Sequence, residues 1–355
     1  MKVQCNACKK VYNIPDERLP VEKKISFACP SCKNKIELDL RSKSKPEPPP
    51  RQSKTPGGEW QKVSDPSTSL VKKDMKGKVL MEKIIQTVKD LPPMPNVVMK
   101  SQEVLADPNS SVKDLSTILE MDQSLVSKVL KLANSAYYGL SGNVSSIHHA
   151  SSLLGQTILG EVIATAGVAG FLANAMEGYR QEAGELWRHS IATGICSRIM
   201  ADKRKPDISN EAYMAGLLHD VGKIILDPFV LERRKEFDDF MEDEEQTFIN
   251  AEKEILGFDH AEIASKICKK WNIPEQIILA IQYHHSPSLS QGNEMSYFTH
   301  AADYIAIMSG IGYGDDSLLN EMENDVKDFL NLTQEEISGL LLEVIESVEK
   351  ITHDF

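Results

Sequence analysis

Apolar residues recur every three or four positions along most of the chain after residue 75. Clear runs cover residues 79–88 and 125–132, and breaking or capping pairs such as Gly142-Asn143 and Asp227-Pro228 separate such runs. This spacing places apolar side chains on one face of a helix, whereas alternation would indicate a strand. No alternating pattern of useful length follows residue 40. The sequence therefore predicts an all-α helical bundle for most of the chain.

Two amphipathic segments extend this pattern. Residues 231–254 are strongly charged but carry an apolar stripe, which consists of Phe237, Phe240, Met241 and Phe248. We expect a helical hairpin packed on the bundle, and a lid over a polar pocket is the alternative. A final helix should begin at Thr333, because Thr333 and Glu336 form a capping-box pattern ahead of another apolar stripe. That helix either packs on the bundle or mediates dimerisation.

Four cysteines near the N-terminus form two identical pairs, Cys5-x-x-Cys8 and Cys29-x-x-Cys32, with twenty residues between them. Two such pairs can complete a closed tetrahedral sulfur site for zinc, which holds structure and leaves no position open for chemistry. A redox dithiol would normally open a helix after a strand, and a disulfide framework would accompany a secretory signal. Neither pattern is present. The sequence predicts a zinc ribbon over residues 1–40.

Composition changes sharply after the predicted ribbon. Residues 41–74 are rich in Pro, Ser, Lys and Gly and hold too few apolar side chains to form a core. We interpret them as a linker, and a docking motif around the three consecutive prolines is the alternative. The expected domains are therefore the ribbon at 1–40, the linker at 41–74, a helical domain at 75–315 and a C-terminal helical extension at 316–355.

Charge divides the chain at the same boundary. Residues 1–74 hold 16 Lys and Arg against 9 Asp and Glu, whereas residues 75–355 hold 24 against 43. The acidic body should repel a phosphate backbone, so nucleic acid binding is not expected of it and stays unproven for the basic ribbon. The sequence shows no apolar run that we judge long enough to span a bilayer. We expect a soluble, cytoplasmic protein that does not contact a membrane.

Histidines gather in the second half of the predicted bundle. Five of them lie on or beside apolar helical runs, at positions that suggest metal ligation: His189, His219, His260, His284 and His285. Asp220 and Asp303 accompany them. An ionised carboxylate buried in an apolar helix would be several kcal/mol unfavourable without a partner, and a cation is a natural partner. A packed core in which these His and Asp side chains hydrogen-bond to one another is the alternative.

Spacing brings two further residues into this picture. Lys223 lies four positions after His219, so an ammonium, an imidazole and the Asp220 carboxylate should converge from one helical face. Glu185 lies four positions before His189 on an earlier helix.

The residues His189, His219-Asp220 and Asp303 resemble the signature of the HD superfamily, helical metal-dependent phosphohydrolases and phosphodiesterases. The upstream stretch resembles the narrower HDOD family. Its motifs are Leu91-Pro-Pro-Met-Pro95, Ala106-Asp-Pro108, Met121-Asp-Gln-Ser-Leu125, Lys131-Leu-Ala-Asn-Ser-Ala-Tyr-Tyr-Gly139, Ile147-His-His-Ala150 and Leu154-Gly155. Residues 1–40 resemble the short zinc ribbons of bacterial regulatory proteins. The HDOD resemblance runs from about residue 80 to 310 and implies a bacterial signalling output.

The resemblance also implies a metal site. His260, His284 and His285 match the additional histidines of the HD-GYP phosphodiesterases, which bind two or three metals, and Lys223 matches their phosphate-contacting lysine. Glu185 falls where some of them place an extra ligand. Those enzymes carry a Gly-Tyr-Pro loop after the paired histidines, whereas this chain has Ser286-Pro-Ser-Leu289. Metal binding is unaffected by that difference, but hydrolysis of cyclic di-GMP loses its main support.

Two hypotheses follow. The first is a regulatory module that acts through protein partners, with a homodimer as one arrangement, and that carries zinc in the ribbon and divalent iron or manganese at the HD site. The second is a metal-dependent phosphohydrolase or phosphodiesterase acting on a nucleotide or cyclic dinucleotide. In the second, Asp220 bridges two cations and Lys223, as the catalytic residue, offsets charge on the phosphoryl oxygens.

Overall fold

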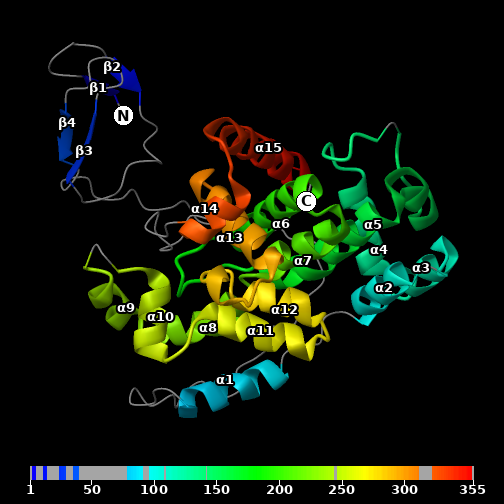
Figure 1. Cartoon of the computed structure of the whole chain (residues 1–355), viewed down its shortest axis with the longest axis horizontal. Coiled ribbons are helices and arrows are strands. Elements are labelled where there is room, and N and C mark those ends of the chain that lie inside the picture. The colour runs from blue at the N-terminus through cyan, green and yellow to red at the C-terminus, as the bar shows by residue number, and fades with distance from the viewer. Residues whose placement is uncertain are drawn as a thin grey trace, which may run out of the picture. The chain divides into compact units, whose positions relative to one another are not determined.

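The computed structural model describes four short strands within residues 2–39 and then residues 78–90, 96–107, 109–140, 142–243, 246–311 and 322–353. The chain forms two compact units, Met1–Thr68 and Ser69–Phe355. Figure 1 shows the strands in the first unit and the helices in the second. The finer boundaries expected at residues 40, 74 and 315 stay predictions.

The first unit contains two antiparallel hairpins. Strand β1 (Lys2–Gln4) pairs with β2 (Val11–Asn13), and β3 (Lys24–Ala28) pairs with β4 (Lys35–Asp39). Each cysteine pair therefore falls, in sequence, between the two strands of one hairpin. The four cysteines themselves, Cys5, Cys8, Cys29 and Cys32, lie outside the described residues, so zinc ligation by these thiolates stays a prediction.

The second unit is helical, which confirms the predicted fold class. No strand is present among its described residues. Its helices are α1 (Lys78–Asp90), α2 (Asn96–Ala106), α3 (Val112–Leu119), α4 (Gln123–Ala133), α5 (Ile147–Leu172), α6 (Glu185–Arg204), η3 (Pro206–Ile208), α7 (Ser209–Leu218), α8 (Gly222–Glu232), α9 (Arg234–Phe240), α10 (Phe248–Leu256), α11 (His260–Lys270), α12 (Glu275–Gln282), η4 (Pro287–Leu289), α13 (Glu294–Met308), α14 (Asn324–Leu330) and α15 (Gln334–Thr352).

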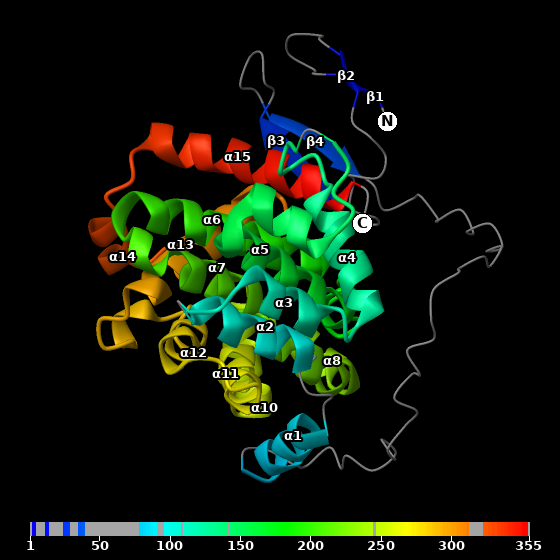
Figure 2. The same cartoon turned by 90° about the vertical axis from the view of Figure 1, so that its right-hand side faces the viewer.

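Helix α6 lies at the centre of the second unit. It packs against α7, α13 and α15, and Figure 2 shows α15 on one side of it and α7 on the other. Apolar side chains such as Ile191 and Ile195 are almost completely buried. The approach to α7 is close enough to require glycine, because a Cβ on Gly216 would lie 2.7 Å from Thr193 O. This contact sets α6 and α7 side by side and so positions the residues at their ends.

Helix α5 corrects one sequence expectation. Residues Ile147–Leu172 are long and apolar enough to cross a membrane, the one such helix among the described residues. The expectation that no run of that length exists is therefore wrong by length and composition. However, 61% of its most apolar window is buried inside the unit, as is typical of a core helix. Gly155, with φ of 76°, also interrupts its helical geometry.

The two amphipathic segments both pack on the unit. The charged segment forms α9 and α10, and the rings of Phe237 and Phe248 stack in its buried face with centroids 5.1 Å apart. The final helix, α15, has the expected capping box: Thr333 Oγ1 accepts from Glu336 N, and Glu336 Oε2 accepts from Thr333 N. Its buried face packs on α6 and α13. A role in dimerisation stays a prediction.

Candidate metal centre

Seven of the predicted site residues meet in one buried cluster, which we call the metal centre. They come from α6 (His189), the junction of α7 and α8 (His219 and Asp220), the start of α11 (His260), the end of α12 (His284 and His285) and α13 (Asp303). All are buried except His285, which is half-buried. The structure thus brings together residues that are up to 114 positions apart in the sequence.

The first part of the metal centre pairs two imidazoles. The Nε2 atoms of His189 and His219 lie 3.2 Å apart. Asp303 Oδ1 lies 3.0 Å from the Nε2 of His189 and 3.7 Å from that of His219. Asp220 Oδ2 lies 3.4 Å from His219 Nε2 and 3.7 Å from His189 Nε2. Two nitrogens and two carboxylate oxygens therefore surround one point.

Backbone carbonyls orient these two rings. His189 Nδ1 donates to Ile311 O at 3.2 Å, and His219 Nδ1 donates to Gly216 O at 2.7 Å. A neutral imidazole that donates through Nδ1 presents a lone pair at Nε2. Outer hydrogen bonds of this kind fix the tautomer of metal-ligating histidines. When both imidazoles are neutral, the two Nε2 atoms are therefore acceptors that face each other.

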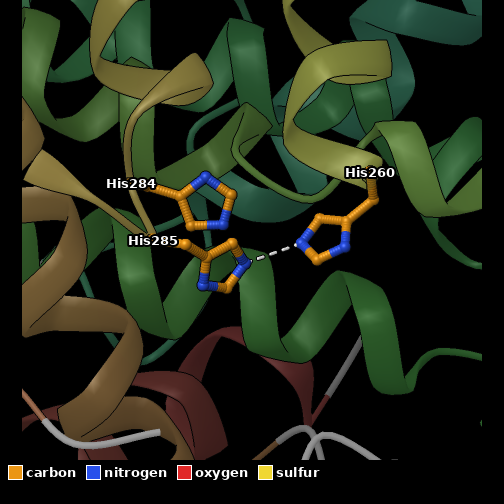
Figure 3. A group of neighbouring side chains, drawn as sticks. All are labelled: His260, His284 and His285. Carbon is orange, nitrogen blue, oxygen red and sulfur yellow. Dashed lines mark hydrogen bonds between the residues drawn. The ribbon is translucent and has the colours of Figure 1, made fainter. Parts of the chain in front are cut away.

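The second part repeats the arrangement around His260. Its Nε2 lies 2.8 Å from His285 Nε2 and 3.2 Å from Asp220 Oδ1. Figure 3 shows His260 facing His284 and His285 across this gap. His260 Nδ1 lies 2.8 Å from Glu252 Oε2 and donates to it. Because Asp220 points one oxygen at each part, its carboxylate links the two.

His284 lies between the two parts. Its Nδ1 donates to Ile281 O at 2.6 Å, whereas its Nε2 is buried with no hydrogen-bond partner. The ring centroid of His284 is 4.9 Å from that of His219 and 3.9 Å from that of His285. A buried acceptor without a partner loses its hydration and gains nothing in return, which costs about 1–3 kcal/mol. A bound cation would remove that cost.

Charge in the metal centre favours anionic carboxylates and a neutral His284. Burial would raise the pKa values of Asp220 and Asp303, but the surrounding histidines outweigh it and hold both well below the usual range, with Lys223 contributing at Asp220. Burial, with His219 and His260 nearby, lowers the pKa of His284 to about 3. Burial also lowers the pKa of His285 well below its usual value. Anionic oxygens and unprotonated imidazoles are the forms that bind metal ions.

Protons can satisfy part of this cluster without a metal. The hydrogen bond and charge of Asp303 outweigh burial and raise the pKa of His189, and Glu252 likewise raises the pKa of His260 well above its usual value. Protonated His189 and His260 would then donate to Asp303 and Asp220. Neither proton reaches the orphaned Nε2 of His284. The donor set therefore fits a metal better than it fits a self-satisfied core.

The centre contains three overlapping sets of ligand atoms. Within each set, the atoms lie within 4.8 Å of one another, which is compact enough for cation binding. The sets are His189, His219 and Asp220; His219, His284 and Asp303; and His260, His284 and His285. Imidazole and carboxylate ligands suit divalent iron, manganese and zinc.

Family models agree with this organisation. The HDOD domain model matches residues 91–287, more than half of the chain. The chain belongs to the HDOD family. A zinc-ribbon domain model matches residues 1–37, so the first unit of this HDOD protein contains a zinc-ribbon domain.

Solved structures share the fold of the HDOD unit. A candidate phosphohydrolase from Shewanella amazonensis SB2B is 23% identical, with a TM-score of 0.60 over 76% of this chain and 97% of that one. A candidate signal transduction protein from Marinobacter aquaeolei VT8 is 22% identical, with a TM-score of 0.62 over 78% of this chain and 64% of that one. These identities show a common fold.

A curated relative extends over a longer chain. It is an uncharacterised protein of Treponema pallidum (strain Nichols), 25% identical over 217 residues, which are 58% of this chain and 40% of that protein. The chain therefore spans well under half the length of this relative.

Two predicted site residues, Glu185 and Lys223, are not among the seven that form the metal centre. Glu185 is half-buried on the first turn of α6, where its carboxylate accepts from Glu182 N at 2.7 Å, and it belongs to none of the three sets of ligand atoms. Its role as a ligand stays a prediction. Lys223 lies inside the HDOD unit, with Nζ 2.8 Å from Asp220 Oδ2.

The structure differs from the sequence expectation in how the chain brings Lys223 to the metal centre. We expected His219 and Lys223 on one helical face, but α7 ends at Leu218 and α8 begins at Gly222, so His219 follows one helix and Lys223 lies in the next. At the start of α8, a Cβ on Gly222 would overlap His260 O. This close approach of α8 and α11 brings His260 beside Asp220.

Sequence reasoning missed Glu252. This carboxylate is completely buried on α10, accepts from both the Nδ1 and the backbone N of His260 at 2.8 Å, and accepts from Tyr179 OH at 2.6 Å. We expected the segment around it to form a helical hairpin packed on the bundle, and assigned only its apolar stripe to the buried face. The available signal was its position four residues after Phe248, on the apolar side of the segment.

Proposed function

We propose that this HDOD protein is a regulatory module of bacterial signal transduction whose helical unit holds divalent metal in a buried centre. It acts through contacts with partner proteins, which include a second copy of the chain, and nucleic acid is not proposed as a ligand. The orphaned Nε2 of His284 carries the metal-binding part of this proposal. Membership of the HDOD family and the description of the Marinobacter structure support the signalling part.

The residues divide between two ions. His189, His219 and Asp303 would hold one ion and His260, His284 and His285 a second, with Asp220 shared between them. We propose iron or manganese here and zinc in the ribbon. When bound, such ions act as Lewis acids. Glu252 and the carbonyls of Ile311, Gly216 and Ile281 orient the imidazoles that face them.

Burial favours a regulatory over a catalytic role. A catalytic metal keeps a position open to substrate, whereas the described ligand residues are buried and His285 alone is half-buried. Lys223, the predicted phosphate contact, already lies in an ion pair with Asp220. The residues that follow the paired histidines, Ser286–Leu289, also lack the Gly-Tyr-Pro loop of the phosphodiesterases.

Elemental analysis of the full chain, purified without added metal, tests metal binding. The wild type should carry zinc together with iron or manganese, and Asp220→Ala should keep zinc alone, because it loses the carboxylate that joins both parts. Asp207→Ala removes an exposed carboxylate of the same unit and should match the wild type. About one zinc per chain and no other metal in the wild type would overturn the proposal.

A phosphohydrolase is the second candidate. It is favoured by the buried ammonium of Lys223 beside Asp220, which would offset negative charge on a phosphoryl group, and the Shewanella structure is described as such an enzyme. Positioning of substrate supplies about 7–11 kcal/mol of barrier reduction. Without the dinucleotide loop, iron- or manganese-loaded protein should show negligible turnover of cyclic di-GMP. Robust hydrolysis that both Asp220→Ala and Lys223→Ala abolish would make the enzyme the better account.

A further inference from the structure

Hydrogen bonds of His300 connect the backbone of the metal centre to the residue that precedes α14. This side chain is buried on α13, three residues before Asp303. Its Nδ1 donates to His284 O at 2.7 Å, and its Nε2 accepts from Glu323 N at 3.1 Å. Both ring nitrogens are therefore used, and one ring joins the backbone of His284 to the residue that precedes α14.

Glu323 makes a second connection to the same loop. Its carboxylate accepts from Ser288 N at 3.1 Å and from Ser288 Oγ at 3.4 Å. Ser288 lies in η4, three residues after His285. The paired histidines are thus held from both sides: His300 holds the carbonyl of His284, and Glu323 holds the segment that follows His285.

The C-terminal helices, α14 and α15, also contact the helices that carry other residues of the centre. Arg204 of α6 donates to Leu330 O at the end of α14, and α15 packs on both α6 and α13. On the opposite side of the undescribed residues 312–321, Ile311 O accepts from His189 Nδ1. The chain therefore contacts His189 of the centre immediately before that stretch and His300, which holds the carbonyl of His284, soon after it.

We infer that His300 and Glu323 are positioning residues that couple metal binding to the anchoring of α14. The inference rests on the proposed function. The Nε2 atoms of His260 and His285 lie 2.8 Å apart, closer than the roughly 3.3 Å that separates two nitrogens each about 2.0–2.1 Å from one tetrahedral ion. A cation held by both nitrogens therefore moves the loop of the paired histidines, and His300 and Glu323 transmit the movement. By linkage, release of α14 must weaken metal binding by the same factor. The C-terminal helices are thereby an output of metal occupancy.

Hydrogen exchange on the full chain reads this coupling directly, because the Glu323 amide is itself the donor to His300. The amides of residues 322–330 should exchange at least about fivefold more slowly in metal-loaded protein than after chelation. Glu323→Ala keeps the amide that donates to His300 but loses both contacts with Ser288, so it should reduce that difference. Thr333→Ala removes the cap of α15 without touching the centre and should retain it.

Variants of His300 separate coupling from simple loss of structure. His300→Ala should weaken iron or manganese binding by about 10–100-fold, as is usual when an orienting hydrogen bond is lost. His300→Asn keeps a donor in the place of Nδ1 and should restore most of the affinity. Its shorter side chain places no acceptor where Nε2 meets Glu323 N, so the exchange difference should stay lost. If the role of His300 were merely structural, metal affinity and the exchange difference would recover together in His300→Asn.

The failures of the two proposals are distinguishable. Absence of any metal beyond the ribbon zinc in the wild type would overturn the proposed function, and this inference with it. Metal-loaded wild type whose 322–330 amides exchange at the same rate before and after chelation would overturn the coupling alone. If His300→Ala fails to fold, Glu323→Ala and His300→Asn give the same two readouts.

Discussion

Helix α6 contributes to two polar clusters whose side chains are paired in different ways. One is the metal centre around His189. The other surrounds Arg198, whose Nε lies 3.4 Å from Glu161 Oε1 and whose Nη2 donates to Tyr137 OH at 2.7 Å. In the Arg198 cluster a cationic donor faces an anionic acceptor. In the metal centre, imidazole nitrogens face each other, with 3.2 Å between the Nε2 atoms of His189 and His219.

The hydroxyl groups beside the Arg198 cluster follow the same balanced pattern. Thr165 Oγ1 donates to Glu161 O at 2.8 Å and lies 2.6 Å from Tyr213 OH, where either oxygen can be the donor. Both clusters contain buried atoms without a hydrogen bond: Glu161 Oε1 and Arg198 Nε in one, and His284 Nε2 in the other. In the Arg198 cluster the acceptor without a hydrogen bond lies 3.4 Å from a cationic donor, whereas the rings nearest His284 Nε2 are other imidazoles. We therefore interpret converging imidazole nitrogens as the sign of a metal site. Burial of polar side chains alone is not such a sign, because Glu161 in the Arg198 cluster is buried too.

Removal of metal should have the largest effect that separates the two clusters. A ligand present at about a thousand times its Kd stabilises a protein by about 4 kcal/mol. Chelation should therefore lower the free energy of unfolding of the helical unit by about that amount, measured by helical circular dichroism in urea. Asp220→Ala should show no such decrease. Equal effects of chelator on both proteins would contradict a cation in the centre.

Glu161 should give the Arg198 cluster a pH dependence. Burial raises the pKa of Glu161 from 4.5 to about 7, against the opposing charge of Arg198 and with help from Asp202. The folded state thus holds this proton more tightly than the unfolded chain, so Glu161 lowers stability as pH rises from 4.5 to about 7, by about 3 kcal/mol in total.

Glu161→Gln does not titrate and should escape that loss. Urea unfolding of wild type and variant at pH 5 and pH 8 measures it: the stability of Glu161→Gln relative to wild type should increase by about 3 kcal/mol between the two pH values. A constant difference would show that the Glu161 carboxyl has an ordinary pKa in the folded protein.

Arg198→Met should lower the free energy of unfolding by about 1–3 kcal/mol, because it leaves Glu161 and Tyr137 buried with one partner fewer. Methionine keeps the apolar stem of the side chain. Elemental analysis of the same samples should give the wild-type metal content. A variant that also loses iron or manganese would show that the two clusters are not independent.

The smallest expected effect comes from a position in neither cluster. Thr333→Ala removes the side-chain cap of α15 and should lower the free energy of unfolding by about 1 kcal/mol. Its metal content and its pH dependence should match the wild type. A larger loss would indicate that α15 contributes more to the unit than its buried stripe suggests.

The sequence predicted the fold and most of the candidate centre because each residue lies in a local pattern. His219 and Asp220 lie in an apolar run, and the helical spacing around Asp303 places it on a buried face. Local patterns contain no information on how helices meet. The position of His260 beside Asp220 depends on the close approach of α8 and α11 at Gly222, which only packing decides.

Glu252 is a second residue whose position depends on how helices pack, which local patterns do not reveal. A glutamate in a charged segment is ordinarily solvated, and its spacing of four residues from Phe248 was the one sign in the sequence that this one faces the core. Its partners, His260 and Tyr179, lie 8 and 73 positions away. The long-range contact with Tyr179 forms only when α10 packs on the unit.

Anomalous X-ray diffraction from crystals of the full chain, purified without chelators, tests the central claim most directly. A cation in the metal centre predicts an anomalous peak about 2.0–2.2 Å from His284 Nε2 or from the facing Nε2 atoms of the histidine pairs. Zinc in the ribbon supplies the internal control for signal. A strong ribbon peak with none in the metal centre, and histidines joined there by hydrogen bonds to one another or to water, would contradict the account.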